Sequence, residues 1–157
     1  MAPDAGFGVL SLDDVRSVDG LTLFKGMMEG RYPAPPIARA IGFEVAEVER
    51  GRVAFTYTPS ADHLNPLGSI HGGIAATLLD GVMGCCIHTT LGAGIGYTTL
   101  EIEVNYVRAM TEKTGKVQAV GKVINVGSRI ATSEGRLYDA NDRLLAHGTT
   151  TCLVFPM

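Results

Sequence analysis

A single acid, Asp80, interrupts an otherwise apolar segment, GGIAATLLDGVMGCCIHTTL, which covers residues 72–91. The segment predicts a helix that is buried on most sides, because it is hydrophobic nearly all round. A carboxylate in such a helix needs a reason, since an unpaired buried charge is costly. Two interpretations stay open: Asp80 has a local partner or points to a rim, or it is a catalytic carboxylate.

Two glycines, Gly72 and Gly73, stand at the start of the predicted helix. Glycine lets another group approach the backbone closely, and the first N–H groups of a helix have no partner within the helix. Together with the positive end of the helix dipole, these amides suit an oxyanion that develops during a reaction. A tight entry from loop to helix would explain the same glycines without chemistry.

The spacing between Gly72 and Asp80 constrains how the two could cooperate. Eight residues separate them, which is about 12 Å along a helix at ~1.5 Å per residue. One carbonyl carbon cannot lie within hydrogen-bond distance of both. If they serve one substrate, two copies of the helix must lie antiparallel, and this predicts a symmetric dimer with composite sites at its interface.

The elements that would position these residues follow from the hydrophobic pattern. A short amphipathic helix with Leu21 and Phe24 on its apolar face is expected before a proline-rich stop. Alternating residues then predict strands, and in one of them Leu100, Ile102, Val104 and Tyr106 share a face. The predicted strands cover residues 43–50, 52–58, 97–108, 116–126, 129–140 and 143–155. One long apolar helix among long strands predicts an α+β domain whose sheet wraps around the helix.

Composition excludes several classes of protein. The 157 residues suffice for one domain, and 46% of them are hydrophobic. The net charge of −3 argues against nucleic-acid binding. No apolar run reaches a membrane span and no signal peptide is recognisable, so a cytoplasmic protein without membrane contact is expected. Neither the four histidines nor Cys85, Cys86 and Cys152 have the spacing of metal ligands, so no metal site is expected.

Four segments resemble the hotdog-fold acyl-CoA thioesterases of the phenylacetate-degradation type, the PaaI-like family. They are HLNPLGSIHGGIAATLLDGVMGC, YTTLEIEVNYVR, GSRIATSEGRLYD and LLAHGTTTCLV, within residues 40–155. The resemblance implies a hotdog fold, in which a curved antiparallel sheet wraps a long central helix. It also implies a homodimer that pairs into a homotetramer. Residues 40–157 would form the thioesterase domain, and residues 1–39 an N-terminal extension with a helical cap.

The resemblance also assigns roles to individual residues. Asp80 matches the catalytic acid, as nucleophile or as base for water, and the backbone N–H of Gly72 matches the group that polarises the thioester carbonyl. Asn65 matches a loop side chain that orients water or the acyl carbonyl, and His71 would shape the entry to the helix. Thr99 falls near a strand hydroxyl that helps to hold water.

Two details of this assignment stay open or depart from related sequences. The register of the strand could favour Thr98 over Thr99. Other branches of the fold carry Glu on the helix with Thr one turn later, whereas here the acid is Asp and Gly84 holds the later position. The match is therefore to the branch that uses a strand hydroxyl.

Coenzyme A would enter as part of the substrate rather than as a cofactor. Gly127, Ser128 and Arg129 match the turn that lies along its pantetheine and phosphates, and Arg suits bidentate pairing with phosphate oxygens. No metal or redox cofactor is required, because the thiolate is a good leaving group. The expected activity is hydrolysis of an acyl-CoA to acid and free CoA. The alternatives are a hydratase or dehydratase on the same fold and a non-catalytic acyl-CoA-binding protein.

Overall fold

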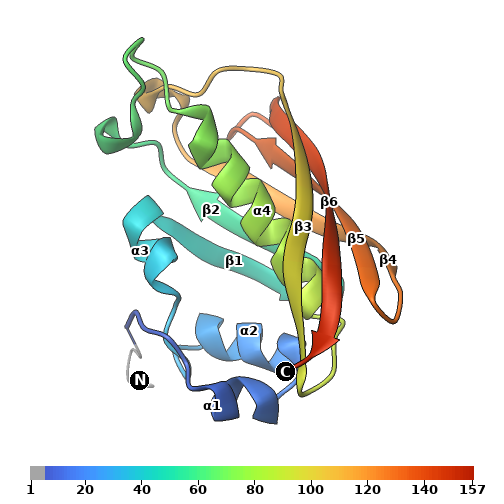
Figure 1. Cartoon of the computed structure of the whole chain (residues 1–157). Helices are drawn as coiled ribbons and strands as arrows, with labels where there is room; N and C mark the ends of the chain where they lie inside the picture. Colours follow the sequence, from blue (N-terminus) through green and yellow to red (C-terminus); the bar gives the residue numbers. More distant parts are fainter. Residues whose placement is uncertain (1–5) are drawn as a thin grey trace.

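A curved antiparallel sheet surrounds one long helix, α4 (Gly72–His88), in the computed structural model, which describes residues 6–157 (Figure 1). The strands are β1 (Phe43–Glu49), β2 (Arg52–Tyr57), β3 (Ile95–Tyr106), β4 (Val117–Val126), β5 (Ile130–Tyr138) and β6 (Leu144–Pro156). Their order in the sheet is β1-β2-β4-β5-β6-β3, which leaves β1 and β3 at the edges. This architecture confirms the α+β prediction of a sheet wrapped around a helix.

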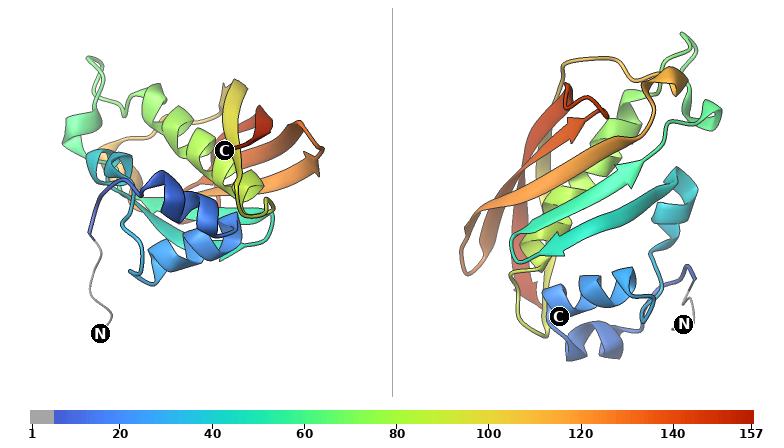
Figure 2. Two further views of the ribbon diagram at one scale, coloured as in Figure 1. Left: turned by 60° about the horizontal axis from the view of Figure 1, so that its bottom comes forward. Right: turned by 180° about the vertical axis from the view of Figure 1, so that it is seen from behind.

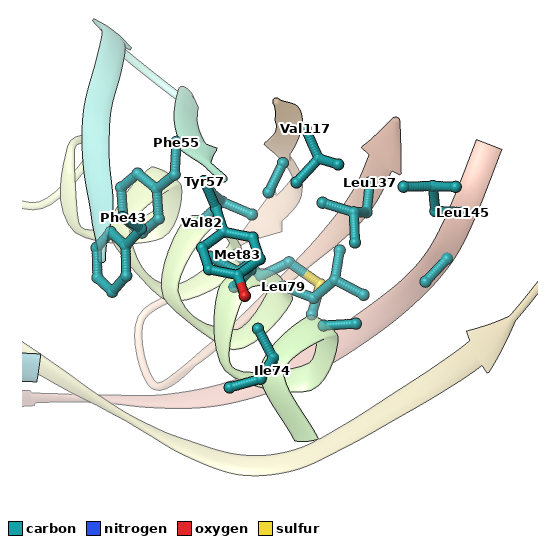
Figure 3. Close-up of a cluster of buried hydrophobic side chains, with 14 of the residues drawn as sticks. Phe43, Phe55, Tyr57, Ile74, Leu79, Val82, Met83, Val117, Leu137 and Leu145 are labelled. Atoms are coloured by element: carbon teal, nitrogen blue, oxygen red, sulfur yellow. The ribbon is translucent and has the colours of Figure 1, made fainter. Parts of the chain in front are cut away.

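The main core lies between α4 and the concave face of the sheet. Leu78, Leu79, Val82 and Met83 of α4 are fully buried. They pack against side chains of the strands, of which Figure 3 labels Phe43, Phe55, Tyr57, Val117, Leu137 and Leu145. The helix is therefore held by apolar burial on most of its circumference, as its all-round hydrophobicity predicts.

Gly121 on β4 brings the sheet into contact with the backbone of α4. A methyl group at this position would overlap the carbonyl group of Val82. At Gly135, on the neighbouring strand β5, an added methyl group would instead collide with the side chains of Leu79 and Met83. These two glycines let the middle of the sheet approach the helix more closely than any side chain would allow.

Within residues 6–157, three helices precede the sheet: α1 (Leu12–Ser17), α2 (Gly20–Met28) and α3 (Pro36–Ile41). α2 packs against α4 at its C-terminal end and against β1, whereas α3 packs against β1, and Figure 2 shows α1 and α2 gathered at one end of the sheet. Phe24 packs edge-on against His88 with 5.6 Å between ring centroids. The amide of Gly20 donates a hydrogen bond of 3.2 Å to the carbonyl of Leu91.

Two features of the structure differ from the sequence predictions. No helix is predicted after the prolines, whereas Pro36 begins α3, because proline is favoured in the first turn of a helix. The predicted domain boundary between residues 39 and 40 falls inside this helix, and residues 1–5 of the proposed extension lie outside the described residues. The division into extension and domain stays a prediction.

The second difference is a β-bulge in β3, which the alternating pattern does not reveal. The pairing of β3 with β6 shifts between Thr99 and Glu101, so that Leu100 is left out of the ladder and is 56% exposed. The expectation that Leu100 shares a face with Ile102, Val104 and Tyr106 was wrong. Ile102 and Val104 pack against the core, and Tyr106, although exposed, reaches the first turn of α4 with its hydroxyl. A bulge adds one residue to a strand, so beyond it odd- and even-numbered side chains exchange faces of the sheet.

Replacement of Gly121 by alanine tests the contact between helix and sheet. The added methyl group meets backbone rather than a flexible side chain, so α4 or β4 must move. We expect Gly121→Ala to lower the free energy of unfolding by about 3 kcal/mol, the upper end of the usual range for overpacking. Urea denaturation measures this, and Gly92→Ala, where the same methyl group meets open space, should cost far less.

Candidate active site

The carboxylate of Asp80 lies half-buried in the middle of α4, where the helix faces β3. Its Oδ1 accepts a hydrogen bond of 3.0 Å from the hydroxyl of Thr99. Together with Ala76, Thr77 and Ile102, these residues line an open depression of about 320 Å³, which we call the Asp80 hollow. Asp80 therefore has a local partner and also faces a space that a ligand could enter.

The bulge at Leu100 explains why Thr99 and Ile102 both line the Asp80 hollow. An odd-numbered and an even-numbered residue of one strand normally point to opposite faces. The extra residue in the bulge brings both side chains to the face of β3 that meets α4. Thr98 is exposed and makes no hydrogen bond with Asp80, so the structure places the hydroxyl of Thr99 beside the acid.

The start of α4 presents the amide of Gly72. His71 caps the helix, and its Nδ1 accepts a hydrogen bond of 2.9 Å from the amide of Gly73. Within residues 6–157, the amide of Gly72 has no acceptor. The hydroxyl of Tyr106 donates to the carbonyl of Gly72 at 3.1 Å, so the first turn of α4 is also tied to β3.

The side chain of Asn65 is engaged in its own loop. Its carbonyl oxygen accepts hydrogen bonds from the amides of Leu67 and Ser69, at 2.9 and 3.2 Å, and its amide group donates to the hydroxyl of Ser69 at 2.9 Å. The residue thus shapes the loop that leads to His71. A direct contact with substrate would have to use the second N–H of its amide group, and this role stays a prediction.

The predicted catalytic residues fall into two groups. Asn65, His71 and Gly72 stand at the N-terminal end of α4, and Asp80 and Thr99 lie about 12 Å further along the helix. One subunit does not bring the two groups together. The exposed turn formed by Gly127, Ser128 and Arg129 joins β4 to β5, away from the start of α4 (Figure 1).

Tyr97 is a neighbour of the site that sequence reasoning missed. Its ring fills the space beside Gly84, where a Cβ atom would lie 2.8 Å from the tyrosine hydroxyl. The available signal was Gly84 itself, a residue without a side chain one helical turn after Asp80. Burial raises the pKa of Tyr97 well above its usual value and that of the Cys85 thiol to about 12. Both groups therefore remain protonated near neutral pH.

Residues 6–157 hold no group of three or more His, Cys, Asp or Glu side chains arranged to bind a metal ion. No helix in this part of the chain is long and apolar enough to cross a membrane.

Known proteins share this fold and sequence pattern. A model of the thioesterase superfamily matches residues 67–146. The 1,4-dihydroxy-2-naphthoyl-CoA hydrolase of Listeria monocytogenes is 24% identical over 122 residues, which are 75% of this chain and 94% of that protein. The phenylacetic acid degradation-related protein of Ralstonia eutropha is 26% identical, with a TM-score of 0.75 over 83% of this chain and 98% of that one.

A third similar structure, smu.793 of Streptococcus mutans bound to acetyl CoA, is 24% identical with a TM-score of 0.67. It covers 73% of this chain and 89% of its own. The chain belongs to the thioesterase superfamily and has the hotdog fold, so the resemblance found in the sequence is confirmed. It is a hydrolase, which decides against the hydratase and the non-catalytic alternatives.

Removal of the Thr99 hydroxyl tests whether it positions Asp80. Thr99→Val keeps the shape and strand preference of the side chain but leaves the carboxylate free to rotate. A hydrogen bond to a charged group contributes about 1.5–3 kcal/mol, so we expect kcat for thioester hydrolysis to fall roughly tenfold or more. Thr98→Val, on the exposed face, is the matched control. Equal activity of the two variants would contradict a positioning role.

Proposed function

We propose that the protein hydrolyses acyl-CoA thioesters at composite sites formed between two copies of the chain. The observation that carries this proposal is the separation of two complementary groups on one helix. The Gly72 amide and the Asp80 carboxylate are both open to a ligand, yet they lie about 12 Å apart. An antiparallel second copy of α4 would place the Gly72 of each subunit opposite the Asp80 of the other.

The Gly72 end would hold the carbonyl oxygen of the thioester. Within the described residues its amide has no acceptor, and it lies at the positive end of a 17-residue helix. As a tetrahedral intermediate forms, negative charge gathers on the carbonyl oxygen, and the hydrogen bond from Gly72 strengthens. The His71 cap engages the next amide, that of Gly73, and so keeps the first turn in place without blocking Gly72.

The Asp80 end would supply the attack on the carbonyl carbon. As a base, Asp80 takes a proton from water while the water oxygen bonds to the carbon; the C–S bond then breaks and the proton passes to the thiolate. As a nucleophile, Asp80 itself bonds to the carbon and expels the thiolate, and water then hydrolyses the anhydride. Thr99 holds one carboxylate oxygen in either case, so the geometry serves both routes.

The position of β3 supports a dimer. β3 is an edge strand, and the Asp80 hollow lies directly beside it. An unpaired edge invites pairing with another chain, and two β3 edges that pair antiparallel would bring two α4 helices antiparallel. Further pairing into a tetramer, which the resemblance implies, belongs to the same proposal.

Coenzyme A as the leaving group rests on the superfamily and on the names of two similar proteins, one a naphthoyl-CoA hydrolase and one bound to acetyl CoA. The exposed Arg129, at the turn between β4 and β5, makes no ion pair within the described residues, so its guanidinium is available for a phosphate. Gly127 closes the turn by donating to the carbonyl of Ile130 at 2.8 Å.

Two substitutions separate the halves of the proposed site. Asp80→Asn removes the charge and should lower kcat by about 10²–10⁴-fold. Gly72→Pro removes the amide hydrogen and should cost about 10²–10³-fold. Proline suits this first helical position, and His71, with φ −57° and ψ 134°, already has a polyproline-II-like backbone, which a following proline permits. Gly72→Ala adds only the Cβ, which would meet the ring of Tyr106 at 3.2 Å in both variants, but it keeps the amide, so it should retain far more activity than Gly72→Pro.

Mixing the two inactive variants then tests the composite site. In a mixed dimer, one site combines the intact Gly72 of one chain with the intact Asp80 of the other. Random pairing makes about half of the dimers mixed, each with one working site of two, so activity should return to about a quarter of wild type. Absence of recovery in a sample proven by two affinity tags to contain mixed dimers would overturn the composite site.

The role of Arg129 is tested separately. Arg129→Ala should raise KM for acyl-CoA while kcat changes little, because a remote phosphate contact stabilises the ground state and the transition state alike. The same variant should show no change in KM with a truncated acyl-pantetheine thioester, which lacks the nucleotide. An unchanged KM for acyl-CoA would remove Arg129 from the binding site.

A further inference from the structure

A cavity of about 220 Å³ opens beside Gly72, and we call it the Gly72 cavity. It lies where the first turns of α4 meet the end of β3 and the strands β5 and β6. Its walls are mainly the apolar side chains of Ile70, Ala75, Met110, Leu137, Leu145 and Ala146. Figure 3 shows Leu137 and Leu145 at one end of the buried cluster, far from Phe43.

The walls of this cavity select against the CoA part of a substrate. Pantetheine carries two amides that need hydrogen-bond partners, and burying an unpaired amide is costly. Of the described lining residues only Arg108 is charged; it is exposed, and its guanidinium donates to the carbonyl of Leu144 at 2.7 Å. An uncharged apolar group is the ligand that such walls accept.

We infer that the Gly72 cavity receives the acyl chain of the substrate, an inference that rests on the proposed function. Gly72 lies at the boundary of the cavity, so a carbonyl oxygen held by its amide places the attached chain at the entrance. Tyr106 lines the same entrance, and its hydrogen bond to the Gly72 carbonyl ties the rim to α4.

The volume limits the length of the chain. An apolar cavity of about 150 Å³ accommodates benzene, with six carbon atoms. In proportion, the Gly72 cavity of about 220 Å³ holds eight or nine carbon atoms. The substrate class is therefore apolar acyl groups of up to about eight carbons, and longer chains would leave their ends outside.

Two buried residues of the wall determine this limit. Ala75 faces the cavity from α4 and Met110 from the segment after β3, and both are nearly inaccessible to solvent. A larger side chain at position 75 fills the space that the chain would use. A smaller side chain at position 110 adds space.

The experiment measures kcat/KM for unbranched acyl-CoAs from acetyl to dodecanoyl. Each methylene that becomes buried should raise kcat/KM about fourfold. For the wild type, kcat/KM should therefore rise with chain length up to about eight carbons and then level off or fall. Ala75→Leu should lower the ratio of kcat/KM for octanoyl-CoA to that for butanoyl-CoA at least tenfold. Met110→Ala should lengthen by about three carbons the chain at which kcat/KM stops rising.

Two control variants carry the same types of substitution at positions outside the cavity. Ala40→Leu on α3 and Met28→Ala on α2 are exposed and do not line the cavity, so both should keep the wild-type chain-length profile. If Ala75→Leu fails to fold, as circular dichroism would reveal, Met110→Ala decides the question.

The outcomes separate the two proposals. Wild-type protein that hydrolyses no acyl-CoA of any length would overturn the proposed function. Hydrolysis with one chain-length profile in wild type, Ala75→Leu and Met110→Ala would leave that function intact and overturn the assignment of the cavity. A preferred chain length that becomes shorter in Ala75→Leu and longer in Met110→Ala would support the assignment.

Discussion

Contact between the backbones of β4 and α4 determines how deeply the helix lies within the sheet. Gly121 permits this contact against Val82, and Gly135 extends the close approach to the next strand. Helix depth matters for chemistry, because it sets which face of α4 is sealed in the core and which face remains beside β3. Asp80 lies on the second face, two residues before Val82, so its charge avoids the cost of complete burial.

The edge strand β3 connects the parts of the site. Thr99 near its middle bonds to Asp80, and Tyr106 at its end bonds to the first turn of α4. The bulge at Leu100 lets both side chains face the helix, although one stands at an odd and the other at an even position. As the unpaired edge of the sheet, β3 is also where the proposed second subunit would join. Substrate binding, catalysis and assembly would therefore all depend on one strand.

The helix itself separates two environments that a thioesterase needs. Its N-terminal end offers an amide beside an apolar cavity, and its middle offers a carboxylate beside an open hollow. In the proposed dimer, each substrate would meet the amide of one copy and the acid of another. Apolar burial of the remaining helix surface supplies the rigidity that keeps both groups in place.

The sequence by itself determined the long helix, the succession of strands along the chain and the two candidate site residues on that helix, whereas the order of the strands within the sheet came from the structure. Hydrophobic periodicity and an isolated acid are local signals, and Asp80 and Gly72 stand out without any coordinates. The tertiary structure alone decided that Thr99 rather than Thr98 meets the acid, that Leu100 is exposed, and that Tyr97 fills the space at Gly84. These features depend on a bulge and on contacts between distant segments, and no local pattern of residue types encodes either.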